Sequence, residues 1–308
     1  MRRESLRLTA AHLLMVILLG IVIFAPKTKA ILQGPVPLIA GISVMELLFI
    51  ISVLRSRRAN SYVSTGPTDI ITLVWILMIV WELCTSVLDI AHPVLVPAPE
   101  NVFYTFVEHW RTMLLNVSYS MTLLLGGMAA GLGTAIVLGL FSGWNKRLKA
   151  FAYPVANVMA PIPAIVISPY LVAIMPTFRS ASLVVVILGV FWPQFLGIIN
   201  RIASIEPEIL DSARIMKLSQ PVMLFRIILP YIIPGILTSL KVTMTTSVLM
   251  LNFAELMGAT HGMGYYIQNS IVYANYTHAA AGIIVIGVVV TILGGIVGMI
   301  QKKFIKWH

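Results

Sequence analysis

The feature that most constrains this chain is a series of long apolar segments. Each has about the 17–25 residues that cross a hydrocarbon core of roughly 30 Å. Only 10% of the residues are charged and 59% are hydrophobic, and a soluble fold of 308 residues could not bury that much apolar surface. We therefore predict an all-α, polytopic transmembrane helical bundle. The expected spans are about eight in number, at about residues 9–25, 36–54, 70–91, 117–142, 150–175, 181–199, 230–257 and 279–300.

The basic residues orient these spans. If the spans alternate in direction, 16 of the 21 Lys and Arg residues lie on one side of the membrane. They occur as clusters at residues 2–7, 55–58, 146–149, 201–226 and 302–306. By the positive-inside rule this side is the cytoplasm, so both termini are cytoplasmic. The net charge of +10 is then explained by membrane topology, which argues against nucleic-acid binding.

Turn-forming residues divide the chain into parts. Residues 1–58 are predicted to form an N-terminal transmembrane hairpin. Residues 59–69 are polar and turn-rich, which is typical of a linker, here on the cytoplasmic side. Residues 70–308 then form a six-span unit.

Glycine and proline are concentrated in the middle of that unit. Gly127 and Gly131 have the G-x-x-x-G spacing that lets two helix backbones approach closely, either in general packing or at a pore-side crossing. Pro161 and Pro163 belong to a group of five prolines near the fifth span. Each proline removes a backbone hydrogen bond, and broken backbone is tolerated at membrane depth only against protein or water. We expect this span to face the interior.

Three glutamates lie within the predicted spans: Glu46, Glu82 and Glu255. Intramembrane charge is costly and usually functional, so a proton-coupled secondary transporter is one alternative function. A structural hydrogen-bonding role for these groups is the other. No His and Glu residues occur at metal-ligand spacing, which argues against an intramembrane enzyme, and we predict neither catalytic residues nor a metal site.

One substantial cytoplasmic loop, 201–229, follows the sixth span. Pro207 and the acidic residues after it suit a helix start. Helical spacing of Ile209, Leu210, Ala213 and Met216 predicts one short amphipathic helix, and Leu224, Phe225 and Ile228 predict a second, after a break near 217–220. Two such helices would form a rigid cytoplasmic projection that a partner protein could grip.

This loop resembles the "EAA" loop of permease subunits in ATP-binding-cassette importers. Asp211-Ser212-Ala213, Lys217 and Ile227-Ile228-Leu229-Pro230 follow its spacing, with Lys217 where the family has glycine. If that position needs a left-handed backbone, a residue other than glycine costs on the order of 1 kcal/mol. The segments 95–102, 153–163, 191–194, 254–258 and 262–265 also resemble the sulfonate, taurine and nitrate branch, so the resemblance covers roughly residues 70–300.

The resemblance implies a bacterial cytoplasmic (inner) membrane transport subunit of the type I importer permease fold, and no enzyme activity in this chain. No G-x-x-x-x-G-K-[ST] loop occurs, so ATP and Mg²⁺ would be bound by a separate ATPase. The implied partners are two copies of that ATP-binding subunit, a second permease chain forming a homodimer, an external solute-binding protein, and membrane lipid.

The resemblance also implies roles for particular residues. ATPase coupling would involve Glu208, Asp211, Ser212, Ala213, Arg214, Lys217, Leu229 and Pro230. The outer gate and pathway would involve Glu255, Gly258, Gly262, Gly264, Pro161 and Pro163. The expected solute is a small organic anion such as a sulfonate, taurine or nitrate, or otherwise a vitamin or pyrimidine precursor. Lys241 is the one basic residue within the predicted spans, which weakens the case for an anion.

Overall fold

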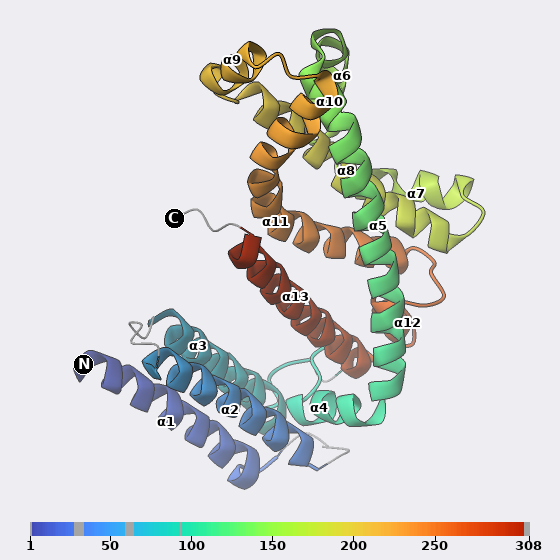
Figure 1. Cartoon of the computed structure of the whole chain (residues 1–308). Coiled ribbons are helices and arrows are strands. Elements are labelled where there is room, and N and C mark those ends of the chain that lie inside the picture. The colour runs from blue at the N-terminus through green and yellow to red at the C-terminus, as the bar shows by residue number, and fades with distance from the viewer. Residues whose placement is uncertain (1, 28–33, 59–64, 93, 305–308) are drawn as a thin grey trace. The chain divides into compact units, whose positions relative to one another are not determined.

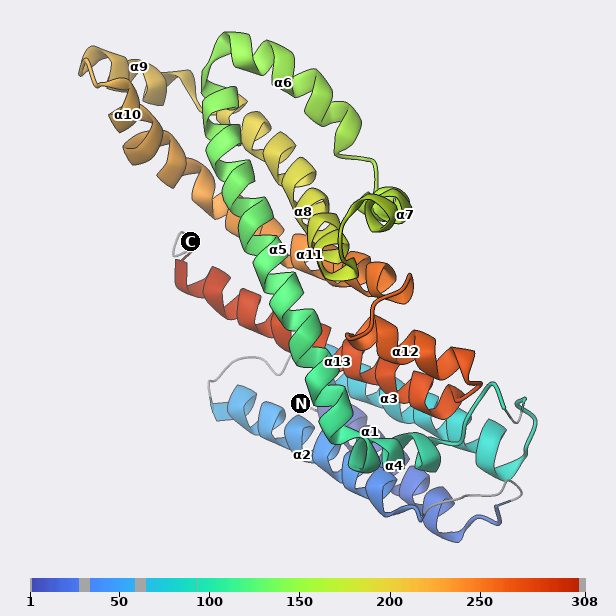
Figure 2. The same cartoon turned by 90° about the vertical axis from the view of Figure 1, so that its right-hand side faces the viewer.

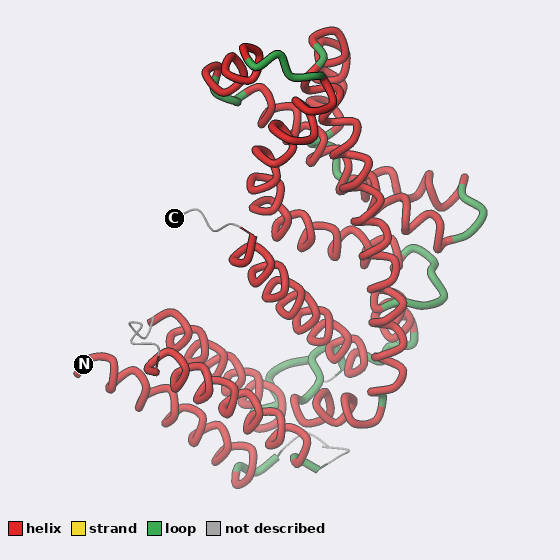
Figure 3. The backbone as a smooth tube through the Cα atoms, in the orientation of Figure 1, coloured by secondary structure: helices red, strands yellow, loops and turns green. Residues whose placement is uncertain are grey.

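The computed structural model describes residues 2–27, 34–58, 65–92 and 94–304, and the regular elements in these ranges are all helices (Figure 3). The chain divides into two compact units. The first comprises Met1–Thr112 with Asn269–Ile283, and the second comprises Met113–Gln268 with Ile284–His308. The all-α prediction is confirmed.

Seven helical segments in the described part of the chain are long and apolar enough to cross a membrane. They are Leu6–Phe24, Val36–Leu54, Gly66–Val87, Trp110–Trp144, Phe178–Ala203, Gln220–Leu256 and Tyr276–Phe304. An eighth crossing is possible if Lys146–Met159 and Ala164–Ile174, which meet at a bend of 93°, count together as one broken span. With this eighth crossing, the basic clusters at residues 146–149 and 201–226 lie on the same side of the membrane, and without it they lie on opposite sides. The positive-inside rule therefore favours eight crossings.

The first unit contains four helices and a π-helical turn. They are α1 (Arg2–Phe24), α2 (Val36–Arg58), α3 (Thr65–Glu82), η1 (Leu83–Val87) and α4 (Pro99–Glu108). The start of α3 makes residues 65–69 of the predicted linker helical, while residues 59–64 lie outside the described ranges. Trp75 of α3 is fully buried against Leu18 and Leu38 of the N-terminal hairpin. The hairpin therefore shares a core with α3.

Several charged side chains within this unit form pairs. Glu46 contacts the Nδ1 atom of His12. Lys27 donates to the carboxylates of both Glu82 and Glu100, and its Nζ lies 2.8 Å from Glu100 Oε1. Burial opposes the charge on Lys27, but the hydrogen bonds from its ammonium to Glu100 and Glu82 outweigh this and raise its pKa. Burial likewise opposes ionisation of Glu100, yet the hydrogen bond from Lys27 holds the pKa of Glu100 below its ordinary value.

The second unit is built around three helices that pack against one another, Trp110–Trp144, Phe178–Ala203 and Leu229–Leu256. Its elements are α5 (Trp110–Trp144), α6 (Lys146–Met159), α7 (Ala164–Ile174), α8 (Phe178–Ala203), α9 (Pro207–Ile215), α10 (Gln220–Val222), η2 (Met223–Ile228), α11 (Leu229–Leu256), α12 (Met263–Val272) and α13 (Tyr276–Phe304). Three of these helices, α5, α12 and α13, also have residues in the first unit. Figure 2 shows α6 running on into the sharply turned α7.

Helix α8 packs between α5 and α11. On the α5 side, a Cβ atom at Gly131 would lie 2.8 Å from the carbonyl oxygen of Ile187, so only glycine permits this approach. On the α11 side, Gln194 Nε2 donates to Thr243 Oγ1 at 2.6 Å, and Arg201 donates to the carbonyl oxygen of Gly235 at 2.8 Å. The close approach expected from the glycine spacing is confirmed, and its partner is the adjacent helix α8.

Candidate functional site

The cytoplasmic loop begins with a short, well-formed helix. Pro207 is the first residue of α9, and Glu208 lies in the first turn, where a negative charge interacts favourably with the helix dipole. Ser212 donates its hydroxyl to the carbonyl oxygen of Glu208 at 2.7 Å. The helix ends at Ile215, close to the expected break.

Lys217 turns the chain after α9 through a left-handed backbone, with φ of 50°. This conformation costs a residue with a Cβ atom about 1–2 kcal/mol. The position at which the resembling loops carry glycine therefore needs glycine-like geometry here, and Lys217 adopts it with its side chain exposed to solvent.

The second short helix expected from the sequence is instead the first turns of a long one. α10, η2 and α11 follow one another without a break from Gln220 to Leu256. Pro230 explains the π-helical turn between them, because its ring crowds the carbonyl four residues earlier. The chain accommodates the crowding with a wider turn, in which the Leu229 N–H donates to the Leu224 carbonyl oxygen.

The apolar side chains of this segment divide between a buried and an exposed set. Ala213 is buried in a cluster with Met223 and Leu224. Met216 and Phe225, which belong to the predicted apolar faces of the two short helices, are 68% and 51% exposed. The reason is local: α9 ends before Met216, and the π turn rotates Phe225 away from the core. Ile215 is also exposed, at 82%.

The polar residues assigned to coupling lie at the solvent face of the same segment. Glu208, Asp211 and Ser212 are exposed, whereas the side chain of Arg214 lies outside the described part of the chain. Trp144 at the end of α5 donates its indole N–H to Gln220 Oε1 at 2.6 Å, which ties the loop to the end of the helix bundle (Figure 1). The arrangement is an anchored projection with an exposed apolar and acidic surface.

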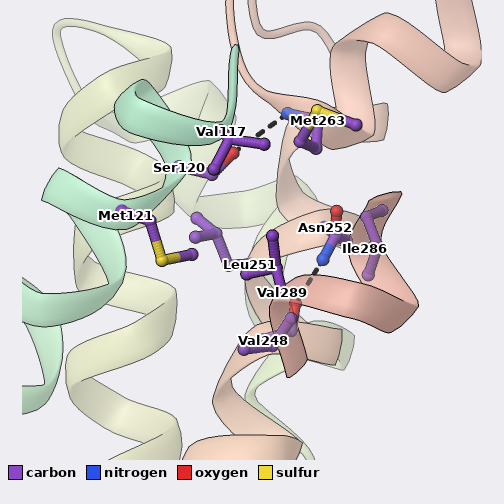
Figure 4. A pocket seen from close by; sticks show the side chains of 9 residues that line it. All are labelled: Val117, Ser120, Met121, Val248, Leu251, Asn252, Met263, Ile286 and Val289. Atoms are coloured by element: carbon purple, nitrogen blue, oxygen red, sulfur yellow. Dashed lines mark hydrogen bonds between the residues drawn. The ribbon is translucent and has the colours of Figure 1, made fainter. Parts of the chain in front are cut away.

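A second group of polar residues meets at the other end of α11. The carboxylate of Glu255, 1% exposed, accepts hydrogen bonds from Ser120 Oγ at 2.7 Å and from the Gly264 N–H at 2.8 Å. Ser120 in turn accepts from the Met263 N–H at 2.9 Å (Figure 4). The side chain of Asn116 accepts from the Gly262 N–H at 2.8 Å. These bonds clamp the start of α12 between α5 and α11.

Glycine is required at three places in this clamp. Gly258 and Gly262 have φ of 139° and 117°, values that side chains with a Cβ atom rarely adopt. A Cβ atom at Gly264 would clash with the carbonyl oxygen of Asn252 and lie 2.8 Å from Glu255 Cβ. The cavity beside the clamp has a volume of about 10 Å³, comparable to one water and far too small for a solute (Figure 4).

The structure therefore brings together Glu255, Gly262 and Gly264 of the residues assigned to the outer gate. Gly258 lies against the ring of Phe178 at the start of α8. Pro161 and Pro163 occupy the turn between α6 and α7 and are exposed.

Sequence reasoning missed Asn116 and Ser120. A signal for both was available, because they lie four residues apart, on the face of α5 that also carries Leu124, Gly127 and Gly131. All five residues are buried. A periodic row of small and polar residues in an otherwise apolar span marks a face that packs against protein.

Comparison with known proteins agrees with this arrangement. Residues 135–306 match the family model described as "Binding-protein-dependent transport system inner membrane component". The putative aliphatic sulfonates transport permease protein of Bacillus subtilis is 23% identical over 76% of this chain and 85% of its own length. The taurine transport system permease protein of Escherichia coli is 23% identical over 80% and 89%.

A solved structure supports the fold. The MetNI methionine ABC transporter in inward-facing conformations aligns with a TM-score of 0.51 and 18% identity, covering 64% of this chain and 96% of that chain. The proton-coupled alternative does not fit these relatives, and ATP is used by a partner ATPase in this family. The chain belongs to the family of binding-protein-dependent transport system inner membrane components, and it is the permease subunit of an ABC importer.

Proposed function

We propose that two identical copies of this chain form the solute pathway, and that loop 201–229 of each copy docks on one of two ATPase subunits, which bind ATP and Mg²⁺. The observation that carries the docking role is the exposure of Ile215, Met216 and Phe225 on an anchored cytoplasmic segment. Large apolar side chains exposed to water beside acidic ones are typical of a protein-binding surface.

The docking role is tested by co-purification. The tagged chain is isolated from its native host in mild detergent, and the accompanying chains are identified. We expect an ATPase with a phosphate-binding loop in the wild-type preparation. Replacing both Ile215 and Met216 by Asp should remove the ATPase from the preparation. Each of these side chains, once buried in the interface, contributes roughly 1.5–3 kcal/mol, or more than tenfold in affinity.

Leu95→Asp serves as the control, since Leu95 is 51% exposed in a loop predicted to face outward. Replacing residues 211–214 together is a second test of the same surface. Retention of the ATPase by both loop variants would contradict the docking role, as would a wild-type preparation that transports solute without any ATPase.

We further propose that the clamp around Glu255 forms the outer gate. Its hydrogen bonds join α5, α11 and the start of α12. These helices therefore either move together or break the hydrogen bonds when they move apart. Glu255→Ala should strongly reduce ATP-driven uptake while the protein remains folded. Asp69→Ala, at an exposed position outside both the docking loop and the clamp, is the control. Normal uptake by Glu255→Ala would contradict the gate.

For the solute, we propose a small organic anion of the sulfonate class. Lys241 of α11 and Lys302 of α13 line one groove of about 490 Å³, together with Thr245 and Thr291, and no acidic residue is among the groove's described lining. A positive groove without a carboxylate favours an anion over an uncharged vitamin or pyrimidine precursor. The sulfonate and taurine permeases among its relatives point the same way.

Growth of the native host tests this class. A strain lacking the chain should fail to use an alkanesulfonate or taurine as its sulfur source. Wild-type protein should restore growth, Lys241→Arg should restore it largely, and Lys241→Met should restore it poorly. Unchanged growth of the deletion strain on sulfonates, combined with a requirement for an added pyrimidine precursor, would favour the other solute class.

A further inference from the structure

Three metal-ligating side chains converge within the first unit, and none of them belongs to either site described above. Glu108 and His109 end α4, and His278 lies in the first turn of α13. One ligand atom from each lies within 4.8 Å of those of the other two. The two imidazole rings are 4.1 Å apart between centroids, and both histidines are half-buried.

Local structure holds each of these side chains in place. The His109 N–H donates to the Thr105 carbonyl oxygen at 2.8 Å and so closes the end of α4. Asn275 caps α13, because its side-chain oxygen accepts from the His278 N–H at 3.2 Å. Immediately before it, Ala274 adopts a left-handed φ of 55°, a strained conformation for a residue with a Cβ atom. This strained turn positions the Asn275 cap and the His278 side chain that follows it.

We propose that Glu108, His109 and His278 bind a divalent transition-metal ion of the zinc type on the outer side of the protein. Two imidazole nitrogens and one carboxylate oxygen suit Zn²⁺ and its neighbours, whereas Ca²⁺ and Mg²⁺ prefer oxygen ligands alone. Three protein ligands leave a fourth position for water or for a group from a partner.

To bind the ion, the three ligand atoms need to move only slightly closer to one another. Zinc ligands at about 2.0–2.1 Å from the ion lie about 3.3 Å from one another in a tetrahedron. Glu108 is exposed and can supply this movement by rotating its side chain. The Asn275 side-chain nitrogen lies 2.9 Å from His278 Nδ1. Binding through Nε2 leaves the ring proton on Nδ1, so the Asn275 amide must turn away from it, and binding through Nδ1 displaces the amide.

The bound ion would tie the end of α4 to the start of α13. Both segments lie in the stretches between predicted spans at 92–116 and 258–278, which the alternation of the spans assigns to the side opposite the basic clusters, so the ion would be accessible from outside the cell. This site does not depend on the docking, gate or solute proposals, since none of its ligands takes part in them.

Metal binding to the purified full-length chain tests the proposal. The protein is prepared in lipid nanodiscs without a polyhistidine tag, and Zn²⁺ is titrated by calorimetry. Co²⁺ is added in parallel, because its visible absorption reports tetrahedral nitrogen and oxygen ligation. We expect one ion per chain with micromolar affinity, and at least a 100-fold loss in the His109→Gln/His278→Gln double variant.

Two further variants sharpen the result. The control His92→Gln/His261→Gln removes two other histidines of the outer loops and should bind as the wild type does. Asn275→Asp keeps the helix cap and offers a carboxylate to His278 Nδ1–H, so it should tighten binding by roughly tenfold. Glu108→Gln, at an exposed position, should weaken binding by about tenfold without affecting the fold.

Three outcomes would overturn the proposal. One is the absence of binding by the wild-type chain up to 1 mM metal, on the order of the weakest specific sites. Another is equal loss in the control variant. The third is wild-type affinity in both Glu108→Gln and the double variant, with thermal unfolding confirming that each is folded.

Discussion

At the scale of single residues, backbone conformation and buried charge decide what this chain tolerates. Lys217 and Gly262 both have positive φ, at 50° and 117°, but only one of them is glycine. The region near φ of 60° is accessible to other residues at a modest cost, whereas values near 120° are essentially restricted to glycine. A lysine is thus tolerated in the turn after α9, and no comparable exchange is expected at the clamp around Glu255.

Lys217→Gly should stabilise the protein slightly. The substitution removes about 1 kcal/mol of left-handed strain. The greater freedom of glycine in the unfolded chain offsets part of this, so we expect a gain below about 1 kcal/mol. Lys149→Gly, inside α6, is the matched control and should destabilise by about 1 kcal/mol. Thermal unfolding in detergent would measure both, and a loss of stability in Lys217→Gly would contradict the assigned turn.

The buried Glu100 should make stability depend on acidic pH. Its folded pKa is lowered, so its contribution is complete above the ordinary value of 4.5 and is lost as the pH falls through the lower folded value. We expect the unfolding temperature of the wild type to fall below about pH 4.5, and to fall less steeply in Glu100→Gln. The exposed Glu206→Gln should follow the wild type. Parallel pH profiles for Glu100→Gln and wild type would refute this assignment.

At the scale of elements, helix packing rests on small residues in register. Gly127, Gly131 and Gly139 all lie where a Cβ atom would approach α8 to within 2.8 Å or less. Gly133 is two residues from Gly131 but points away, with open space around it. The same residue type therefore has opposite consequences on two faces of one helix.

Gly131→Ala and Gly133→Ala should accordingly change stability in opposite directions. A methyl group at 131 meets the backbone of α8, which cannot move aside as a side chain can, and we expect a loss of about 1–3 kcal/mol. At 133 the methyl group only improves helix propensity, with a gain of up to about 1 kcal/mol. Unfolding of the two variants in the same detergent distinguishes them. Equal effects would mean that the face of α5 has been assigned incorrectly.

At the scale of the whole molecule, the broken crossing points to a second chain. α6 has 14 residues, or about 21 Å at about 1.5 Å per residue, which is short of the roughly 30 Å core. If α6 and α7 together form one broken crossing, we expect their junction to lie within the membrane, and residues 161–163 of that junction are exposed. Irregular backbone at this depth must be covered by protein or must line water.

The assembled importer should therefore contain two copies of this chain. Native mass spectrometry of the complex purified through a tag on this subunit would give the stoichiometry. We expect two permease and two ATPase chains. A single copy paired with a different permease chain would contradict the homodimer and leave the cover of the α6–α7 junction to that other chain.

The sequence by itself determined the membrane class, the positions of the spans and the family resemblance of loop 201–229. These follow from local patterns: apolar length, the placement of Lys and Arg, and the spacing from Asp211 to Pro230. It also placed Lys217 at the usual glycine position, where a left-handed backbone would be costly, and the structure shows that the backbone there is left-handed. Such properties depend on a residue and its near neighbours, which is why they could be predicted without coordinates.

Only the tertiary structure decided which distant residues meet. Ser120 and Glu255 are 135 positions apart, and their hydrogen bond depends on how α5 and α11 are rotated. The continuity of α10 with α11, and the convergence of His109 with His278, likewise follow from a π turn and from chain packing. Periodicity assigns a side chain to a face of its own helix, but the element opposite that face is set by packing of the whole bundle.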